Sequence, residues 1–232
     1  MGNYRYRGLG DIPAADPASP IVPGPRPGML YIKSTGEYVD AKSWNEEPIY
    51  DSEVIATPFA AGNRVILFRN TNNFVTGVAK DLRYTNMVGQ SQLPSGWFAQ
   101  VNMMSIRVLQ LETAAGSGLF TTPEDVQRIL EEGVLTFETG NQKVEKEAPL
   151  YHWPCPIGPS GFGMRTGAAF TSFSAVNNGV PSFAATKELE LPVVLSNELT
   201  FQATLTFPGG LTLDNNCIVQ MILFTYMSKP LR

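Results

Sequence analysis

The chain has 232 residues, of which 43% are hydrophobic and only 16% are charged. That length suits one large β-domain or two small ones. The low charged share leaves much neutral surface, which is easily desolvated against a partner. The formal net charge of −4 argues against a basic nucleic-acid-binding surface that covers the whole molecule, but leaves a local basic tail open.

The two cysteines, Cys155 and Cys217, are too few for a disulfide framework. Cys217 begins an apolar run, so we expect a small buried hydrophobe there, and Cys155 lies in a proline-flanked loop. We therefore expect the two thiols to be unpaired. We also expect no signal peptide after Met1 and no helix long and apolar enough to span a bilayer.

Residues 1–28 differ in composition from the rest of the chain. Their six prolines fix φ and remove backbone donors, which predicts an extended, polyproline-like arm. This segment is either a disordered tail or an arm that orders against a neighbouring subunit, where Tyr and Arg are favoured contact residues. The expected contact residues of the arm are Tyr4, Arg5, Tyr6, Arg7 and Arg26.

The first half of the chain after the arm predicts a series of strands. A hairpin is expected over 29–32 and 37–39, and the longest strand candidate runs over 97–111. The apolar positions of that strand change parity, which predicts a β-bulge between Asn102 and Ser105. Shorter strands are expected at 53–57, 64–69 and 74–79.

One short helix is predicted at about 122–132. Thr122 suits the N-cap, Pro123 the first helical position, and Gly133 the end of the helix. Asp125 would complete a capping-box-like pair in the first turn. We expect an apolar stripe of Val126, Ile129 and Leu130, and a solvated acidic face of Glu124, Asp125, Glu131 and Glu132.

The second half predicts a hairpin over 134–138 and 142–146, a strand within 167–176, and three long strands at 187–195, 198–207 and 217–226. In the middle run, apolar residues alternate with Thr and Gln, which indicates a strand packed on one face. We therefore predict an all-β, antiparallel jelly-roll or Greek-key sandwich with one short helix and an extended N-terminal arm. The expected domains are the arm, 1–28, and one sandwich, 29–232, with long loops near 70–96 and 153–183.

Catalytic chemistry is poorly supported by the residues. His152 is the only histidine, and we expect it to pack on Trp153 rather than to activate Cys155. The acidic pairs Glu46-Glu47 and Glu131-Glu132 imply no shared pocket. The Asx-rich segments 70–73 and 214–216 are more typical of turns than of calcium loops. We expect no catalytic, cofactor or metal site and no small-molecule substrate, so the chain is predicted not to be an enzyme.

Four stretches together resemble the jelly-roll capsid proteins of icosahedral viruses, particularly tailless bacteriophages: 93–108, the helix and hairpin of 122–146, the paired strands 189–207 and the closing strand 217–226. They cover a little over a third of the chain. The resemblance implies a virion protein, made in the host cytoplasm, that forms a trimer or higher homo-oligomer within a shell. It also implies contacts with other virion proteins and weak contact with the genome or an internal membrane. Lys229 and Arg232 are the expected C-terminal contact residues.

A carbohydrate-binding, lectin-like β-sandwich is the alternative, as in a receptor-binding spike or vertex protein. Trp44, Trp97 and Trp153 would then offer stacking platforms for sugars. A β-sandwich hydrolase has the least support.

Overall fold

The computed structural model describes residues 29–32, 37–40, 44–110, 123–140, 143–155 and 188–229. The chain divides into two compact units, Met1–Lys42 and Ser43–Arg232. In the first unit, β1 (Met29–Ile32) pairs antiparallel with β2 (Glu37–Asp40), as the sequence predicted. The division falls after Lys42. Among the described strands, β1 and β2 pair only with each other.

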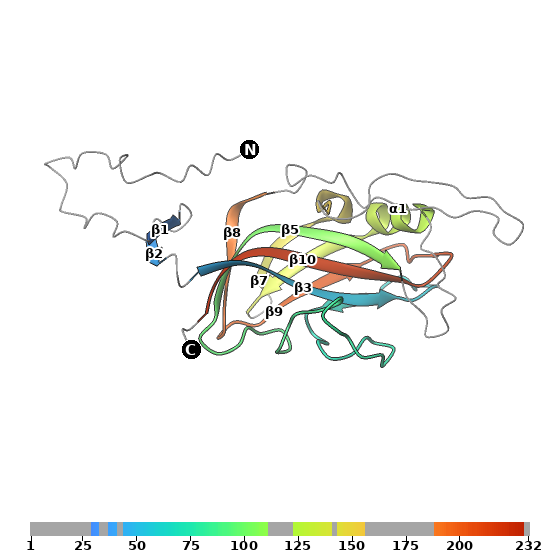
Figure 1. The fold of residues 1–232 in the computed structure, drawn as a ribbon. Coiled ribbons are helices and arrows are strands. Elements are labelled where there is room, and N and C mark those ends of the chain that lie inside the picture. Colours follow the sequence, from blue (N-terminus) through green and yellow to red (C-terminus); the bar gives the residue numbers. More distant parts are fainter. Residues whose placement is uncertain are drawn as a thin grey trace, which may run out of the picture. The chain divides into compact units, whose positions relative to one another are not determined.

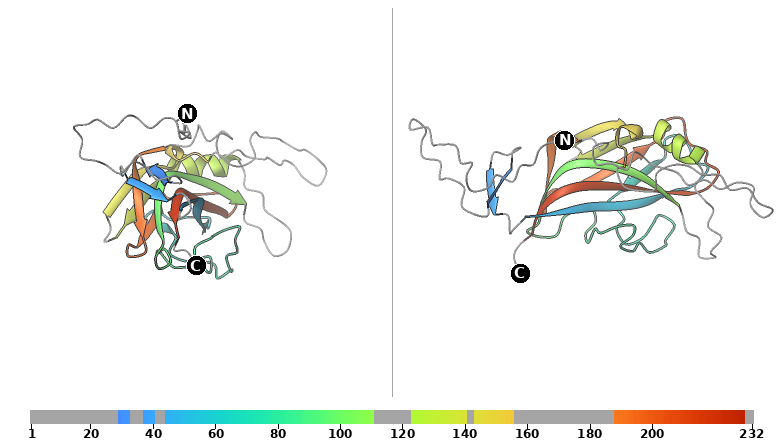
Figure 2. Two further views of the ribbon diagram at one scale, coloured as in Figure 1. Left: turned by 60° about the vertical axis from the view of Figure 1, so that its left-hand side comes forward. Right: turned by 45° about the horizontal axis from the view of Figure 1, so that its top comes forward.

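The second unit contains two four-stranded antiparallel sheets that pack face to face, with the helix near one end (Figure 1 and Figure 2). The first sheet has the order β3 (Trp44–Ile55), β10 (Cys217–Ser228), β5 (Phe98–Gln110), β8 (Glu188–Ser196). The second has the order β4 (Arg64–Leu67), β9 (Phe201–Thr206), β6 (Val134–Thr139), β7 (Lys143–Pro149). The predicted long strand 97–111 and the hairpin near 134–146 are thus confirmed.

The path of the chain between the two sheets defines a jelly roll. Counted along the chain from β3, the strands of the first sheet are the first, eighth, third and sixth, and those of the second are the second, seventh, fourth and fifth. Every connection between successive strands therefore crosses from one sheet to the other, except the β6–β7 hairpin. Two such interleaved Greek keys are the jelly-roll arrangement, which confirms the predicted fold class.

The expectation that strands 189–207 pair with each other is wrong. β8 pairs with β5 in the first sheet, whereas β9 pairs with β4 and β6 in the second. Their short link, 197–200, has the length and polarity of a hairpin loop, so the sequence does not distinguish it from a crossing between layers.

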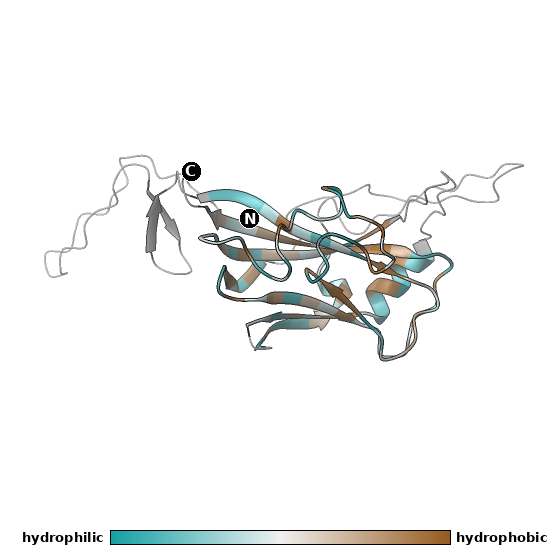
Figure 3. Ribbon diagram, turned by 90° about the horizontal axis from the view of Figure 1, so that it is seen from below, coloured by the Kyte–Doolittle hydropathy of each residue, from teal (hydrophilic) through white to brown (hydrophobic). Residues whose placement is uncertain are grey.

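The alternating pattern predicted for the last third of the chain forms one side of the core. Phe201, Ala203, Leu205 and Phe207 are all buried, and hydrophobic segments recur along the strands of both sheets (Figure 3). In β5, Asn102 has no partner on either β10 or β8, because the register shifts between Val101 and Met103. This is the predicted bulge, and it restores the inward direction of the apolar side chains.

Two strand predictions on the β3 side of the sandwich differ from the structure. β3 begins at Trp44 rather than at residue 53. The sequence around Pro48 is acidic and lacks the apolar alternation of a strand, so this half of β3 was not predicted. A proline is nevertheless tolerated on an edge strand. The strand predicted at 74–79 is wrong: Asn73 and Ala79 form a single bridge around a tight turn, in which Gly77 has a φ of 81°.

The helix α1 (Pro123–Glu132) lies where the sequence predicted it. Val126 and Ile129 are buried, as expected for its apolar stripe. Asp125 is not part of a solvated face: it is fully buried, and its Oδ1 accepts the N–H of Asp214 at 2.8 Å. Asp125 is buried because the loop before β10 covers this side of the helix.

The junction between α1 and β6 requires a glycine. A Cβ at Gly133 would lie 2.4 Å from Leu150 Cδ1, 2.7 Å from the Ile129 carbonyl oxygen and 2.9 Å from Phe207 Cε1. We expect Gly133→Ala to lower the free energy of unfolding by about 1–3 kcal/mol through overpacking, measured by denaturant titration. Gly209→Ala is the matched control, since nothing lies within 4 Å of its Cβ. Equal stability of the two variants would contradict this packing.

Candidate functional site

The loop 68–97 covers the β3 edge of the first sheet, and it lies below β3 in Figure 1. Asn86 forms hydrogen bonds with backbone groups of β3, as a neighbouring strand would. The Tyr50 N–H donates to Asn86 Oδ1 at 2.9 Å, the Asn86 N–H donates to the Tyr50 carbonyl at 3.3 Å, and Asn86 Nδ2 donates to the Pro48 carbonyl at 2.7 Å. These bonds remove an unpaired strand edge and hold the loop against the sheet.

The same loop inserts a lysine between two buried carboxylates. Lys80 Nζ lies 3.0 Å from Asp51 Oδ1 and 3.2 Å from Glu53 Oε2, and the side chains of all three residues are at most 1% exposed. Asp51 and Glu53 alternate along β3 with Ser52, so their side chains point to the core side of the sheet. We call these three residues the buried ion cluster.

The carboxylates of the buried ion cluster also bind the loop backbone. Asp51 Oδ2 accepts the N–H of Phe68 at 2.7 Å, and Glu53 Oε1 accepts the N–H of Val75 at 2.8 Å. The Lys80 ammonium lies 5.3 Å from the centre of the Phe74 ring. Three points of the segment 68–80 are therefore attached to β3 by charge-assisted contacts.

Sequence reasoning missed the buried ion cluster, although a signal was present. Asp51 and Glu53 have the same parity as Ile49 and Ile55, which are both core residues. Two carboxylates at inward positions of a strand need a buried cation. The sequence does not show that Lys80 supplies it, because the intervening loop has no regular structure.

Removal of Lys80 leaves two buried carboxylates without a counter-ion. We expect Lys80→Met to lower the free energy of unfolding by about 3–5 kcal/mol, measured by urea titration. Lys143→Met is the matched control, because the Lys143–Glu145 pair is largely exposed, with Lys143 75% accessible, and such pairs are worth about 0–1 kcal/mol. Similar losses in the two variants would show that the buried ion cluster contributes no more than a surface pair.

Asp51 gives the stability of the protein a specific pH dependence. Burial raises the pKa of its carboxyl above the ordinary 3.8, and the Lys80 ammonium opposes part of that shift. Between the ordinary and the raised pKa, the native chain binds more protons than the unfolded chain. The contribution of Asp51 to the free energy of unfolding is therefore largest at low pH and falls as the pH rises through the raised pKa.

We expect the unfolding free energy of the wild type to fall relative to that of Asp51→Asn as the pH rises above about 4. Asp81→Asn should show the opposite sign, because a hydrogen bond from Arg83 lowers the pKa of the exposed Asp81. Denaturant titrations from pH 3 to pH 8 measure both differences. A constant difference between wild type and Asp51→Asn would contradict the raised pKa.

Loop 68–97 and the outer surface of the first sheet together form an open hollow of ≈ 600 Å³, which we call the outer-face hollow. Tyr50, Phe224 and Arg107 come from β3, β10 and β5, and Arg83 and Tyr84 come from the loop. The remaining lining is Pro48, Leu82, Leu109, Gln220 and Ile222. The hollow is thus mainly apolar and aromatic, with two guanidinium groups.

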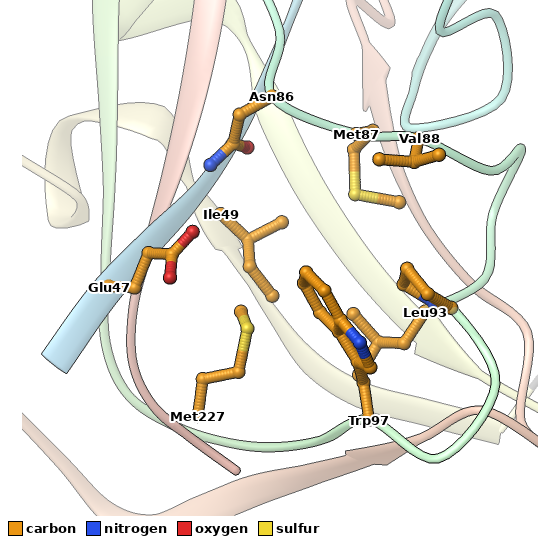
Figure 4. Close-up of a pocket in the computed structure, with 9 residues that line it drawn as sticks. Glu47, Ile49, Asn86, Met87, Val88, Leu93, Trp97 and Met227 are labelled. Carbon is orange, nitrogen blue, oxygen red and sulfur yellow. The ribbon is translucent and has the colours of Figure 1, made fainter. Parts of the chain in front are cut away.

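A second, smaller depression lies at the end of the sheet where β10 finishes (Figure 4). Trp97, Met227 and Ile49 face one another in it. Its volume of ≈ 40 Å³ is far below that of typical ligand pockets. Lys229, an expected C-terminal contact residue, forms an ion pair with Glu47 and lies 4.3 Å from the centre of the Trp97 ring.

The other expected contact residues, Tyr4, Arg5, Tyr6, Arg7, Arg26 and Arg232, lie outside the described residues, as do the strand expected within 167–176 and most of the predicted loop 153–183.

The structure separates the residues considered for catalysis. His152 is exposed and forms a ring contact with Tyr151 at 4.6 Å, whereas Cys155 is 1% exposed. Cys155 and Cys217 are both buried, which was predicted for Cys217 only, and they form no disulfide with each other. Within the described residues, no group of three or more His, Cys, Asp or Glu side chains is arranged to hold a metal ion.

The structure describes the side chains of Trp97 and Trp153 but not that of Trp44, and the two described rings do not form a common platform. Trp153 is 3% exposed and belongs to the core, and Trp97 lies beneath the Lys229 ammonium.

Comparisons with known proteins gave no match: no family model, no curated protein and no solved structure is significantly similar to this chain. Among the described helices, none has the length and hydropathy needed to cross a membrane.

Proposed function

We propose that the protein is a structural virion protein, a jelly-roll capsid subunit that self-assembles into an icosahedral shell around a genome. The observation that carries this proposal is the strand order of the two sheets. The eight-stranded jelly roll recurs in viral capsid proteins, in lectins and in cupins. The exposed side chains of the sandwich support the first of these uses.

Large apolar side chains gather on two exposed segments of the sandwich. Val75, Val78, Leu82 and Val88 of loop 68–97 are between 61% and 77% exposed. Leu191, on the edge strand β8, is 76% exposed. Exposed apolar side chains on a sheet edge favour pairing with another chain. These two segments support a subunit that buries surface against copies of itself, as a trimer or higher oligomer, and against other virion proteins.

The lectin-like alternative has less support. A sugar site needs accessible aromatic faces beside polar partners. Trp153 is buried in the core, and the Lys229 ammonium lies over the Trp97 ring, so neither ring offers an open face to a sugar. Carbohydrate binding is therefore the alternative outcome of the solution experiment.

The test is the state of the full chain in solution at increasing concentration, by light scattering and electron microscopy. We expect multimers or closed shells. Deletion of residues 1–27 should leave the melting curve of the sandwich unchanged and impair assembly. A control with residues 2–27 replaced by a Gly/Ser segment of equal length separates the chemistry of the arm from its length. A strict monomer that binds glycans would contradict the capsid proposal.

A further inference from the structure

The outer-face hollow contains an arginine that is held in place but has no carboxylate partner in the described part of the chain. Arg107 Nε donates to Gln220 Oε1 at 2.6 Å, and Gln220 is 1% exposed. Arg107 belongs to none of the ion pairs among the described residues, whereas Arg83, from the loop, pairs with Asp81 at 2.9 Å. The hollow therefore has one positive charge that no described carboxylate balances.

Buried hydrogen bonds fix the orientation of this arginine. The Gln220 amide nitrogen donates to Ser52 Oγ at 2.9 Å and to the Arg83 carbonyl at 3.0 Å, which directs the Gln220 carbonyl oxygen at Arg107 Nε. Within the described residues, neither terminal nitrogen of the Arg107 guanidinium forms a hydrogen bond. These two nitrogens match the two oxygens of one carboxylate.

The register of the first sheet places apolar side chains beside this arginine, on the same face. Gln220 lies opposite Arg107, and two residues further along β10 Ile222 lies opposite Tyr50. Phe224 follows after two more residues, and all five side chains line the hollow. Four residues of a strand span about 13 Å. The apolar floor therefore extends about 13 Å from the row of the arginine, which is long enough for a two-ring compound.

The aromatic walls of the hollow are preformed. The Tyr50 hydroxyl donates to the Leu82 carbonyl at 2.5 Å, and the Tyr84 ring packs on Phe74 with ring centres 5.0 Å apart. Burial raises the pKa of the Tyr50 hydroxyl, and the charge of Arg107 opposes part of that rise, so the cation acts on the aromatic wall. A site that is already ordered loses little conformational entropy when it binds a rigid ligand.

The size and charge of the hollow indicate the class of its ligand. Its volume of ≈ 600 Å³ lies within the range of about 300–1,000 Å³ that is typical of small-molecule sites. One unbalanced guanidinium matches one carboxylate, and the aromatic lining favours a flat ring system, which it can contact by stacking or edge-to-face packing. A nucleic acid fits less well, because a single cation neutralises one phosphate and gives weak, salt-sensitive binding.

We propose that the outer-face hollow binds a small aromatic carboxylate, with its carboxylate group on the Arg107 guanidinium and its rings against Tyr50 and Phe224. The inference goes beyond the proposed function and does not depend on it, because the hollow lies within one chain.

Equilibrium dialysis of the full chain against 2-naphthoate tests this site, and it can be carried out in any state of assembly. We expect one site per chain with a dissociation constant on the order of 0.1 mM. The matched ligand 2-naphthamide has the same rings and no charge. It should bind about tenfold more weakly or less, because a hydrogen bond to a charged group is stronger than one to a neutral group.

A pair of arginine variants identifies the cation. Arg107→Gln should weaken the binding of 2-naphthoate about tenfold or more, because the carboxylate loses its charged partner. Arg64→Gln is the matched control: it removes an equal charge from an exposed position on β4, in the second sheet, and should leave the dissociation constant unchanged. Melting curves verify that each variant is folded.

A pair of loop variants locates the ligand without altering a fixed residue of the sheet. Leu82 and Val88 are both 77% exposed, but only Leu82 lines the hollow. Leu82→Glu brings a carboxylate that repels the ligand and competes for Arg107, so it should weaken binding about tenfold. Val88→Glu should have no effect.

The proposal is overturned if 2-naphthoate shows no saturable binding, or if it binds no more tightly than 2-naphthamide. Equal affinities in the Arg107→Gln and Arg64→Gln variants, or in the Leu82→Glu and Val88→Glu variants, would place the ligand elsewhere and overturn it as well. Tighter, Arg107-dependent binding of 2-naphthyl phosphate than of 2-naphthoate would overturn it in favour of a phosphate ligand.

Discussion

The burial of Lys80 between Asp51 and Glu53 is the interaction that holds loop 68–97 on the edge of the first sheet. β3 is an edge strand, and its two inward carboxylates would be isolated charges in the core without the loop that brings the lysine. The same carboxylates accept hydrogen bonds from the backbone amides of Phe68 and Val75. The loop therefore supplies the counter-ion and the hydrogen bonds that the two carboxylates need, and these contacts in turn fix the loop on β3. Neither the sheet edge nor the loop is stable in this arrangement without the other.

This dependence explains why a long irregular segment is so closely packed. An ion cluster of this kind adds little net stability compared with an apolar core, but it specifies one arrangement of the loop, because any other arrangement leaves a buried charge unpaired. The two depressions described above use residues of that loop: Arg83 and Tyr84 line the outer-face hollow, and Met87 lines the smaller depression near Trp97. The jelly roll is thus a rigid support, and loop 68–97 gives its surface specific chemistry.

Much of the sandwich could be predicted from the sequence, because its strands and helix follow local rules. Alternation revealed β9, the change of parity in β5 revealed the bulge at Asn102, and the turn and capping residues placed α1. The failures concern contacts between distant segments. The pairing partners of β8 and β9, the burial of Asp125 against the loop at Asp214 and the match of Lys80 with β3 all depend on segments that only the tertiary fold brings together. The arginine fixed by Gln220 was missed for the same reason, since its β-strand partner is more than a hundred residues away along the chain.

Native-state hydrogen exchange of individual backbone amides tests the central claim most directly. If the buried ion cluster fixes the loop on the sheet, the amides of Phe68 and Val75 should exchange as slowly as those in the middle of β10, because they open only when the sandwich unfolds. The amide of the exposed Thr76 beside them should exchange quickly. Fast exchange at Phe68 and Val75, with β10 still protected, would show that the loop opens independently and that the ion cluster does not hold it in place.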